Sequence, residues 1–195
     1  MSVFQRYQNL KKLVTDRAEP FAQLTEHLEK NTEWMTAPAS TRFHLCKEGG
    51  LLEHSVNVAE TLLKMKELLD PEITDESCAI VGLLHDLGKA GVPGIPQYLV
   101  NEPSPLQDQN RYPASKPYRW NSDLVYLSVP ARSLYLALPF LPLSETEAQA
   151  ILYHDGQYVD DNRSVAKNEE PLTLLLQYAD NWSGFVIEKD TYEKR

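Results

Sequence analysis

The sequence has 195 residues, of which 42% are hydrophobic and 24% are charged, and its formal net charge is −9. This length and composition are typical of one soluble globular domain and exclude a disordered chain. The acidic charge repels phosphate backbones at long range and disfavours nucleic acid as a partner, whereas a local basic pocket can still hold a small phosphorylated substrate.

Cysteine usage and hydropathy indicate the compartment. Cys46 and Cys78 lie far apart in no CxxC pattern, which fits a reducing cytosol and provides no zinc finger. The segment Met1–Lys12 is polar and mixed in charge, unlike a signal peptide. No apolar stretch approaches the ~20 residues that a membrane span needs. We therefore predict a cytoplasmic protein without a membrane partner.

Helical spacing begins at the N-terminus. Apolar residues predict one helix from about Val3 to Arg17, and a second helix is expected to start near Pro20. We expect residues 1–35 to be a helical extension packed on a single domain that spans 1–195.

A glycine pair precedes the next two predicted helices. Residues 41–50 lack periodicity and end in Gly49-Gly50, which permits unusual backbone angles and close approach of other groups. The helix that follows spans 51–69, with His54 on its inward apolar face. Thr74 or Asp75 can cap the second helix.

The second helix carries an adjacent imidazole and carboxylate. The run before His85 is apolar on most of its surface, which indicates burial. A buried Asp86 is unfavourable unless it has a partner or binds a metal. The alternative is an ordinary core histidine that bonds to its neighbour.

A non-helical segment interrupts the pattern. Residues 90–123 are dense in Pro, Gly, Asn and Ser, and 98–100 and 117–120 could pair as a short β-hairpin. We predict an all-α fold, a helical bundle with a small β-hairpin and loop excursion around residues 95–122.

Three more helices complete the chain. One is predicted from 130 to 141, and a capping box at Ser144–Glu147 opens another that ends at His154. Pro171 begins the last helix, with Asp180 at the edge of its apolar stripe. The residues predicted to face inward are Leu172, Leu175, Leu176, Ala179, Val186 and Ile187.

Two imidazoles and two carboxylates lie on or beside the apolar faces of three of these helices: His54, His85, Asp86 and Asp180. Such a core is destabilised by desolvation and repulsion unless a divalent cation compensates. Nitrogen and oxygen ligands without thiolate suit Mn, Fe, Co or Ni better than structural zinc. A cation of this kind activates water and polarises a phosphoryl oxygen, which allows hydrolysis without a covalent intermediate.

The same residues carry a family resemblance. Their order, with Gly88-Lys89 after the His-Asp pair, resembles the H…HD…D signature of the HD-domain metal-dependent phosphohydrolases. Segments 39–44, 48–55 and 143–154 are similar to small bacterial and phage-borne HD hydrolases and to the HD part of a bacterial 3′→5′ exoribonuclease family. The similarity covers about residues 36–185. It implies an all-helical fold, hydrolysis of phosphomonoesters or phosphodiesters, and four metal ligands, His54, His85, Asp86 and Asp180.

The resemblance implies that Lys89 contacts the substrate, and the positions of His154, Arg42 and His44 in the sequence make them candidates for further contacts. Lys89 would hold a phosphate, although a lysine at a helix C-terminus is also favoured by the helix dipole. His154, in a His-Asp pair expected to be less buried than the first, would donate to the substrate or protonate the leaving oxygen, or would simply cap its helix. Arg42 and His44 would contact phosphate or base, with a surface role as the alternative for Arg42.

The number of metal ions follows from a departure from the family pattern. Related members often carry Gly-His just before the helix that holds Leu134, and here residues 127–130 read Leu-Ser-Val-Pro. We therefore predict one divalent metal ion.

The predicted function is a metal-dependent phosphohydrolase acting on a phosphate ester of a nucleotide or similar small molecule. The predicted catalytic residues are Asp86, Lys89 and His154, and the predicted substrate contacts are Arg42, His44, Lys89 and His154. Two alternatives stay open: a 3′→5′ exonuclease or phosphodiesterase on nucleic acid, and a non-catalytic nucleotide-binding HD module. Aromatic residues from Tyr112 to Trp120 could serve a homo-oligomer interface.

Overall fold

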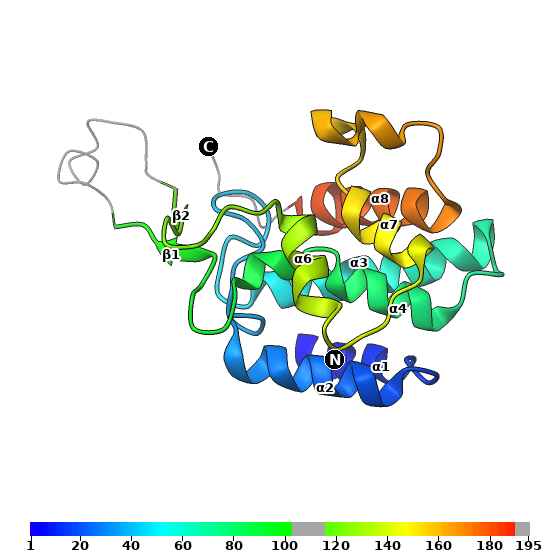
Figure 1. Cartoon of the computed structure of the whole chain (residues 1–195), viewed down its shortest axis with the longest axis horizontal. Coiled ribbons are helices and arrows are strands. Elements are labelled where there is room, and N and C mark those ends of the chain that lie inside the picture. The colour runs from blue at the N-terminus through cyan, green and yellow to red at the C-terminus, as the bar shows by residue number, and fades with distance from the viewer. Residues whose placement is uncertain (103–115, 190–195) are drawn as a thin grey trace.

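The computed structural model describes residues 1–102 and 116–189 and is mostly helical (Figure 1). Its α-helices are α1 (Val3–Lys11), α2 (Ala18–Asn31), α3 (Gly50–Leu69), α4 (Asp75–Leu84), α6 (Val129–Ala137), α7 (Glu145–Tyr153) and α8 (Pro171–Trp182). Tighter 3-10 turns are η1 (Leu87–Ala90), η2 (Gly156–Tyr158) and η3 (Asp160–Val165), and a π-helical turn, η4 (Ser183–Ile187), follows α8. The described strands are β1 (Tyr98–Val100) and β2 (Tyr118–Trp120). The all-α prediction is confirmed.

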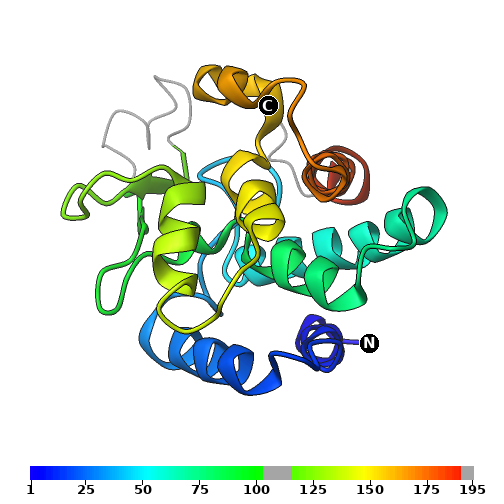
Figure 2. The same cartoon turned by 45° about the vertical axis from the view of Figure 1, so that its right-hand side comes forward.

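The helices form layers around α3 and α4. In Figures 1 and 2, α1 and α2 cover one side of this central pair, and α7 and α8 cover the other. Buried apolar side chains from all these layers belong to one core cluster, which includes Tyr7, Leu28, Leu62, Ile80 and Leu176. None of the described helices is both long and apolar enough to span a membrane.

Several capping and turn residues adopt the local structures that the sequence predicts. The Thr74 hydroxyl accepts a hydrogen bond from the Ser77 backbone N–H and caps α4. The reciprocal capping box of Ser144 and Glu147 opens α7. The two strands pair antiparallel, which confirms the small β-hairpin.

Glycine allows the close approaches that bring α3 to its neighbours. Gly49 has a φ of +72°, and a Cβ on Gly50 would lie 2.0 Å from the Leu45 carbonyl oxygen. At the crossing of α3 and α4, a Cβ on Gly82 would lie 2.5 Å from the Cα of Ala59. Only glycine at position 82 permits this contact, so Gly82 sets the distance between α3 and α4. That distance in turn determines how near His54 and His85 come to each other.

The first helix is shorter than predicted. It ends at Lys11 rather than near Arg17. The backbone N–H groups of Thr15 and Asp16 donate to one Glu76 oxygen at 2.7 and 2.8 Å. Since a carboxylate on α4 takes these donors, the chain leaves the helical path early.

The prediction that Val186 and Ile187 face inward is wrong. Their side chains are 41% and 49% exposed, whereas Glu188 is 2% exposed. The Glu188 N–H donates to the Ser183 carbonyl at 2.9 Å, which closes a five-residue turn. A π turn adds one residue relative to an α-helix, so Glu188 takes the inward position that the α-helical period assigns to Ile187.

The aromatic segment named as an interface lies only partly within the described residues. Tyr112 falls outside them. Of the residues that the structure describes in this segment, Trp120 is 54% exposed, and its ring packs edge-on against Tyr98 at 5.3 Å between centroids.

Candidate metal centre

Four helices deliver imidazoles and carboxylates to one buried point. His54 lies one turn into α3, His85 is the C-cap of α4, and Asp86 follows it. His154 is the C-cap of α7, and Asp180 lies in the last turn of α8. The structure thus brings together every residue predicted as a metal ligand and adds His154 to the group.

The distances show a tight cluster. His54 Nε2 lies 3.0 Å from Asp180 Oδ1 and 3.6 Å from Asp86 Oδ2. His85 Nε2 lies 3.6 Å from Asp86 Oδ2 and 4.0 Å from Asp180 Oδ1. His154 Nε2 lies 3.5 Å from Asp86 Oδ1. Three imidazole Nε2 atoms therefore point at the same two carboxylates.

Each ring is oriented through its other nitrogen. His85 Nδ1 lies 2.9 Å from the Gly82 carbonyl oxygen, and His154 Nδ1 lies 2.9 Å from that of Ile151. His54 Nδ1 lies 3.2 and 3.1 Å from the two Glu188 oxygens. Because these oxygens only accept, each Nδ1 carries the proton. Each Nε2 then faces the cluster, as in metal-binding histidines.

One buried atom lacks the partner that a metal would supply. Among the described residues, His85 Nε2 is fully buried and has no hydrogen-bond partner. A buried imidazole nitrogen without a partner is unfavourable in a folded protein. The donor set of His54, His85, Asp86 and Asp180 is what divalent transition metals accept, so these residues fit a cation.

The electrostatics of the cluster attract positive charge. Burial lowers the pKa of His54, but Asp180 and Glu188 outweigh it and raise this pKa to about 10. Burial opposes protonation of His154 as well, and Asp86 and Asp155 raise its pKa to about 9. The carboxylates thus hold protons on two imidazoles. A metal held by His54 would replace the proton on this ring, because ligands must be deprotonated, whereas His154 would keep its proton.

The pKa values of the third imidazole, His85, and of the two carboxylates are lowered rather than raised. Burial lowers the pKa of His85 to about 4, and the nearby Asp86 offsets this only in part. Burial would raise the pKa of both Asp86 and Asp180, but Lys89 and His85 outweigh it at Asp86, and His54 outweighs it at Asp180. Both carboxylates are therefore ionised and available as ligands.

Lys89 lies against the cluster. Its Nζ is 2.5 Å from Asp86 Oδ2, and its side chain is 18% exposed. Burial would lower the pKa of this lysine, but Asp86 and Tyr98 raise it, so the amine is charged. The structure places a cation beside the carboxylates, where an anionic substrate could also reach it.

The two predicted substrate contacts before the glycine pair differ in position. The His44 ring lies 4.8 Å from that of His54, and its Nε2 is 3.8 Å from Glu188 Oε2. Burial lowers the pKa of His44 to about 4. Arg42 is exposed, with its guanidinium 5.4 Å from the Phe43 ring centroid. The structure brings His44 to the cluster and leaves Arg42 at the surface.

The expectation that the pair His154-Asp155 is less buried than His85-Asp86 is confirmed at Asp155, whereas His154 itself is buried. His154 is 2% exposed, compared with 3% for Asp86. The end of α7 packs against α8, where Gln177 Nε2 donates to the Tyr153 carbonyl at 3.0 Å. Because α8 covers this end of α7, only Asp155 turns outward, with a side chain 43% exposed.

Glu188 belongs to the site but was not predicted from the sequence. It lies beyond the last apolar residues of the C-terminal helix, in a stretch where helical periodicity fails. The π turn that makes it inward-facing leaves no simple signal in the residue pattern.

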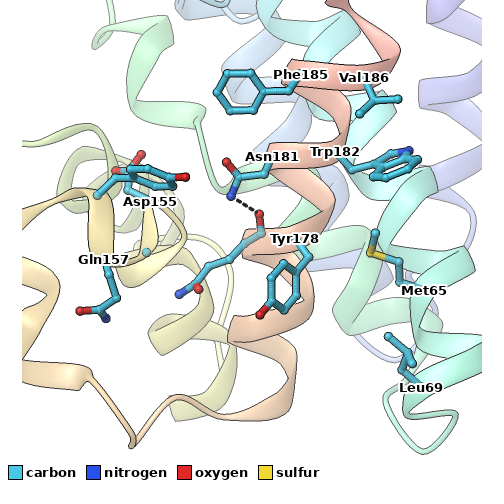
Figure 3. Close-up of a pocket in the computed structure, with 12 residues that line it drawn as sticks. Met65, Leu69, Asp155, Gln157, Tyr178, Asn181, Trp182, Phe185 and Val186 are labelled. Carbon is cyan, nitrogen blue, oxygen red and sulfur yellow. Dashed lines mark hydrogen bonds between the residues drawn. The ribbon is translucent and has the colours of Figure 1, made fainter.

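A surface cleft of about 690 Å³ crosses α8 beside the cluster (Figure 3). Aromatic and apolar side chains on α8 and α3 line it together with amides, one of which, Asn181, donates to the Gln177 carbonyl at 2.8 Å. Asp155 also lines the cleft, and its Oδ1 lies 3.7 Å from His154 Nε2. Asp155 therefore lies between the cleft and the cluster, and the imidazoles and carboxylates of the cluster do not themselves line the cleft.

Comparison with known families identifies the fold. The family model of the HD domain matches residues 51–183, about two thirds of the chain. The chain belongs to the HD domain family. Members of this superfamily are generally metal-dependent hydrolases that act on phosphorylated substrates. No curated protein and no solved structure matches the chain.

The family model matches the segment that contains the predicted metal ligands but not two residues that lie beside them. His54, the His85–Asp86 pair and Asp180 all fall within it. His44 precedes the matched part of this HD domain, and Glu188 follows it. The family therefore accounts for a group able to hold a divalent metal and leaves these two residues unexplained.

Proposed function

We propose that this HD domain is a divalent-metal-dependent phosphohydrolase that hydrolyses a phosphate ester of a nucleotide or a similar small molecule. The observation that carries the proposal is the convergence of three oriented imidazoles on the buried carboxylate of Asp86 and the half-buried carboxylate of Asp180. One ion of Mn, Fe, Co or Ni would be held by His54, His85, Asp86 and Asp180. When bound, it supplies a Lewis acid for water and for a phosphoryl oxygen.

The chain itself supplies the groups that bind the substrate and move protons. Lys89 Nζ, already at the cluster, neutralises a non-bridging phosphate oxygen. His154 has its Nδ1 occupied by a backbone carbonyl, so only its Nε2 faces the reacting centre, and we assign the proton for the leaving oxygen to this atom. His44 contacts the substrate from the opposite side, and Arg42 contacts it from the rim.

The surroundings favour a small substrate. The cleft that Asp155 lines offers an apolar and amide surface for the organic part of a phosphate ester. The net charge of −9 opposes a long polyanion. Both features support a nucleotide-sized substrate over nucleic acid.

The test is phosphate release by the purified chain with Mn²⁺ or Co²⁺. The panel contains nucleoside mono-, di- and triphosphates, small diesters and oligonucleotides, each also tested with Asp86→Asn. Turnover of a small ester that is lost in the variant is the expected result. Cleavage of oligonucleotides alone, with steep salt dependence, would establish an exonuclease. Tight nucleotide binding without turnover would establish a non-catalytic module.

A further inference from the structure

Glu188 is a side-chain carboxylate that contacts the Nδ1 atom of His54, whereas the Nδ1 atoms of His85 and His154 contact backbone carbonyls. His85 and His154 are both oriented by a backbone carbonyl three residues earlier on their own helix. His54 is oriented by a carboxylate 134 residues away, with both Glu188 oxygens within 3.2 Å of Nδ1. His54 is therefore the one cluster imidazole whose orientation depends on a side chain from another element.

Glu188 is itself held in place. Its side chain is buried, and Asn57 Nδ2 donates to Oε1 at 2.8 Å. Asn57 lies three residues after His54 on α3, so one face of this helix presents two partners of the carboxylate. A buried carboxylate with this many donors has a defined position.

The π turn delivers this carboxylate. It follows directly on α8, which carries Asp180, and Ser183 at its start is buried against Thr61 of α3. The extra residue of the turn replaces Ile187 by Glu188 on the inward face. π turns within helices occur often at functional sites, where they re-aim a side chain.

We propose that Glu188 is a positioning residue, which holds the His54 imidazole with Nδ1 protonated and Nε2 directed at the cation. This inference rests on the proposed function, because it assigns to Glu188 a role in the affinity of the same centre. A carboxylate behind a metal-bound histidine fixes the ring and makes it a better ligand. The contact to Glu188 therefore contributes to metal affinity rather than to substrate binding.

The experiment measures Co²⁺ and Mn²⁺ affinity of the full chain by competition with a chromophoric chelator. The variants are Glu188→Gln, which removes the charge, and Asn57→Ala, which keeps the charge but removes one hydrogen-bond donor to the carboxylate. Glu29→Gln is the matched control, since it removes a carboxylate of α2 that pairs with Lys11 and Tyr7 of α1 and has no contact with Asn57 or Glu188 in the described hydrogen bonds. Circular dichroism melts confirm that each variant is folded.

We expect Glu188→Gln to weaken metal binding by about 10–100-fold, Asn57→Ala to weaken it less, and Glu29→Gln to leave it unchanged. The visible spectrum of bound Co²⁺ should change in Glu188→Gln, which a merely structural residue would not cause. Long-range ¹H–¹⁵N spectra of the wild-type chain should show a proton on His54 Nδ1.

Two outcomes separate this inference from the proposed function. If the wild-type chain binds Co²⁺ and folded Glu188→Gln binds it equally well with the same spectrum, the positioning role is overturned and the phosphohydrolase proposal stands. If the wild-type chain binds neither cation, the proposed function is overturned, and the role of Glu188 at a metal centre is overturned with it.

Discussion

The protein buries carboxylates in two places and neutralises them differently. Where α2, α4 and α7 meet, Arg17 donates to Glu76 and Glu147, each at 2.7 Å. In the metal centre, Asp86 and Asp180 face mainly imidazoles, whose positive charge can be removed. A guanidinium keeps its charge at any pH that the fold survives, whereas an imidazole can exchange its proton for a metal.

The comparison separates a structural cluster from a functional one. The Arg17 cluster is complete, because Ser77 and the Ser144 N–H also donate to Glu147. The metal centre is not complete among the described residues, since His85 Nε2 has no hydrogen-bond partner. Buried charge that is fully paired is typical of a structural cluster, and a buried imidazole nitrogen that lacks a hydrogen-bond partner is typical of a site for a ligand.

The largest expected effect is on stability at the structural cluster. Arg17→Met leaves Glu147, 1% exposed, as a buried carboxylate without its cation. Removing one partner of a buried ion pair costs about 3–5 kcal/mol of unfolding free energy, measured by urea denaturation. Lys30→Met is the control, because its pair with Glu26 is exposed to solvent and should contribute little to stability. Equal losses in the two variants would contradict the contrast.

The next effect is on metal binding. Asp86→Asn removes a carboxylate that faces all three imidazoles. Loss of a residue that only hydrogen-bonds to a metal ligand lowers metal affinity by about 10–100-fold, so loss of this proposed ligand should lower it by more than about 100-fold. Phosphate release should fall with it. Asp160→Asn, on an exposed side chain of η3, should change neither quantity. Retained affinity in folded Asp86→Asn would remove Asp86 from the ligand set.

A smaller effect is expected where α3 crosses α4. Gly82→Ala places a Cβ 2.5 Å from the Cα of Ala59, so the helices must move apart. Overpacking of this kind costs about 1–3 kcal/mol, measured by denaturation. It also separates His54 from His85, so metal affinity should fall in the same variant. A variant with wild-type stability and affinity would show that the crossing does not set the geometry of the centre.

The smallest effect is the pH dependence of the structural cluster. Burial raises the pKa of Glu76 and Glu147, but Arg17 outweighs it and holds both below the ordinary 4.5. A carboxylate with a lowered pKa stabilises the fold above its unfolded pKa and loses that stabilisation as the pH falls through the folded value. The stability difference between wild type and Arg17→Met should therefore shrink below about pH 4.5. A constant difference from pH 7 to pH 3 would contradict this account.

The sequence predicts the core of the site because its signals are local. His54 follows an apolar helical period, and His85 and His154 stand at helix ends marked by caps and glycine. Each ligand therefore has a predictable place on its helix. The prediction that these residues meet at one point came from the family resemblance, because helical periodicity does not predict which helix ends lie together.

The parts that could not be predicted depend on distant contacts. The early end of α1 results from Glu76, 60 residues away, which accepts its next backbone donors. The inward turn of Glu188 results from a π turn that breaks the period used to place Val186 and Ile187. Arg17 reaches Glu147 across 130 residues, a pairing that neither charge pattern nor spacing reveals.

Titration of the metal-free chain with Mn²⁺ at several pH values tests the central claim most directly. The account predicts one bound cation, with an affinity that rises with pH as the proton leaves His54, the ligand imidazole whose pKa is about 10. Binding should be lost in Asp86→Asn. No binding by the wild-type chain, or binding that neither pH nor Asp86→Asn alters, would contradict it.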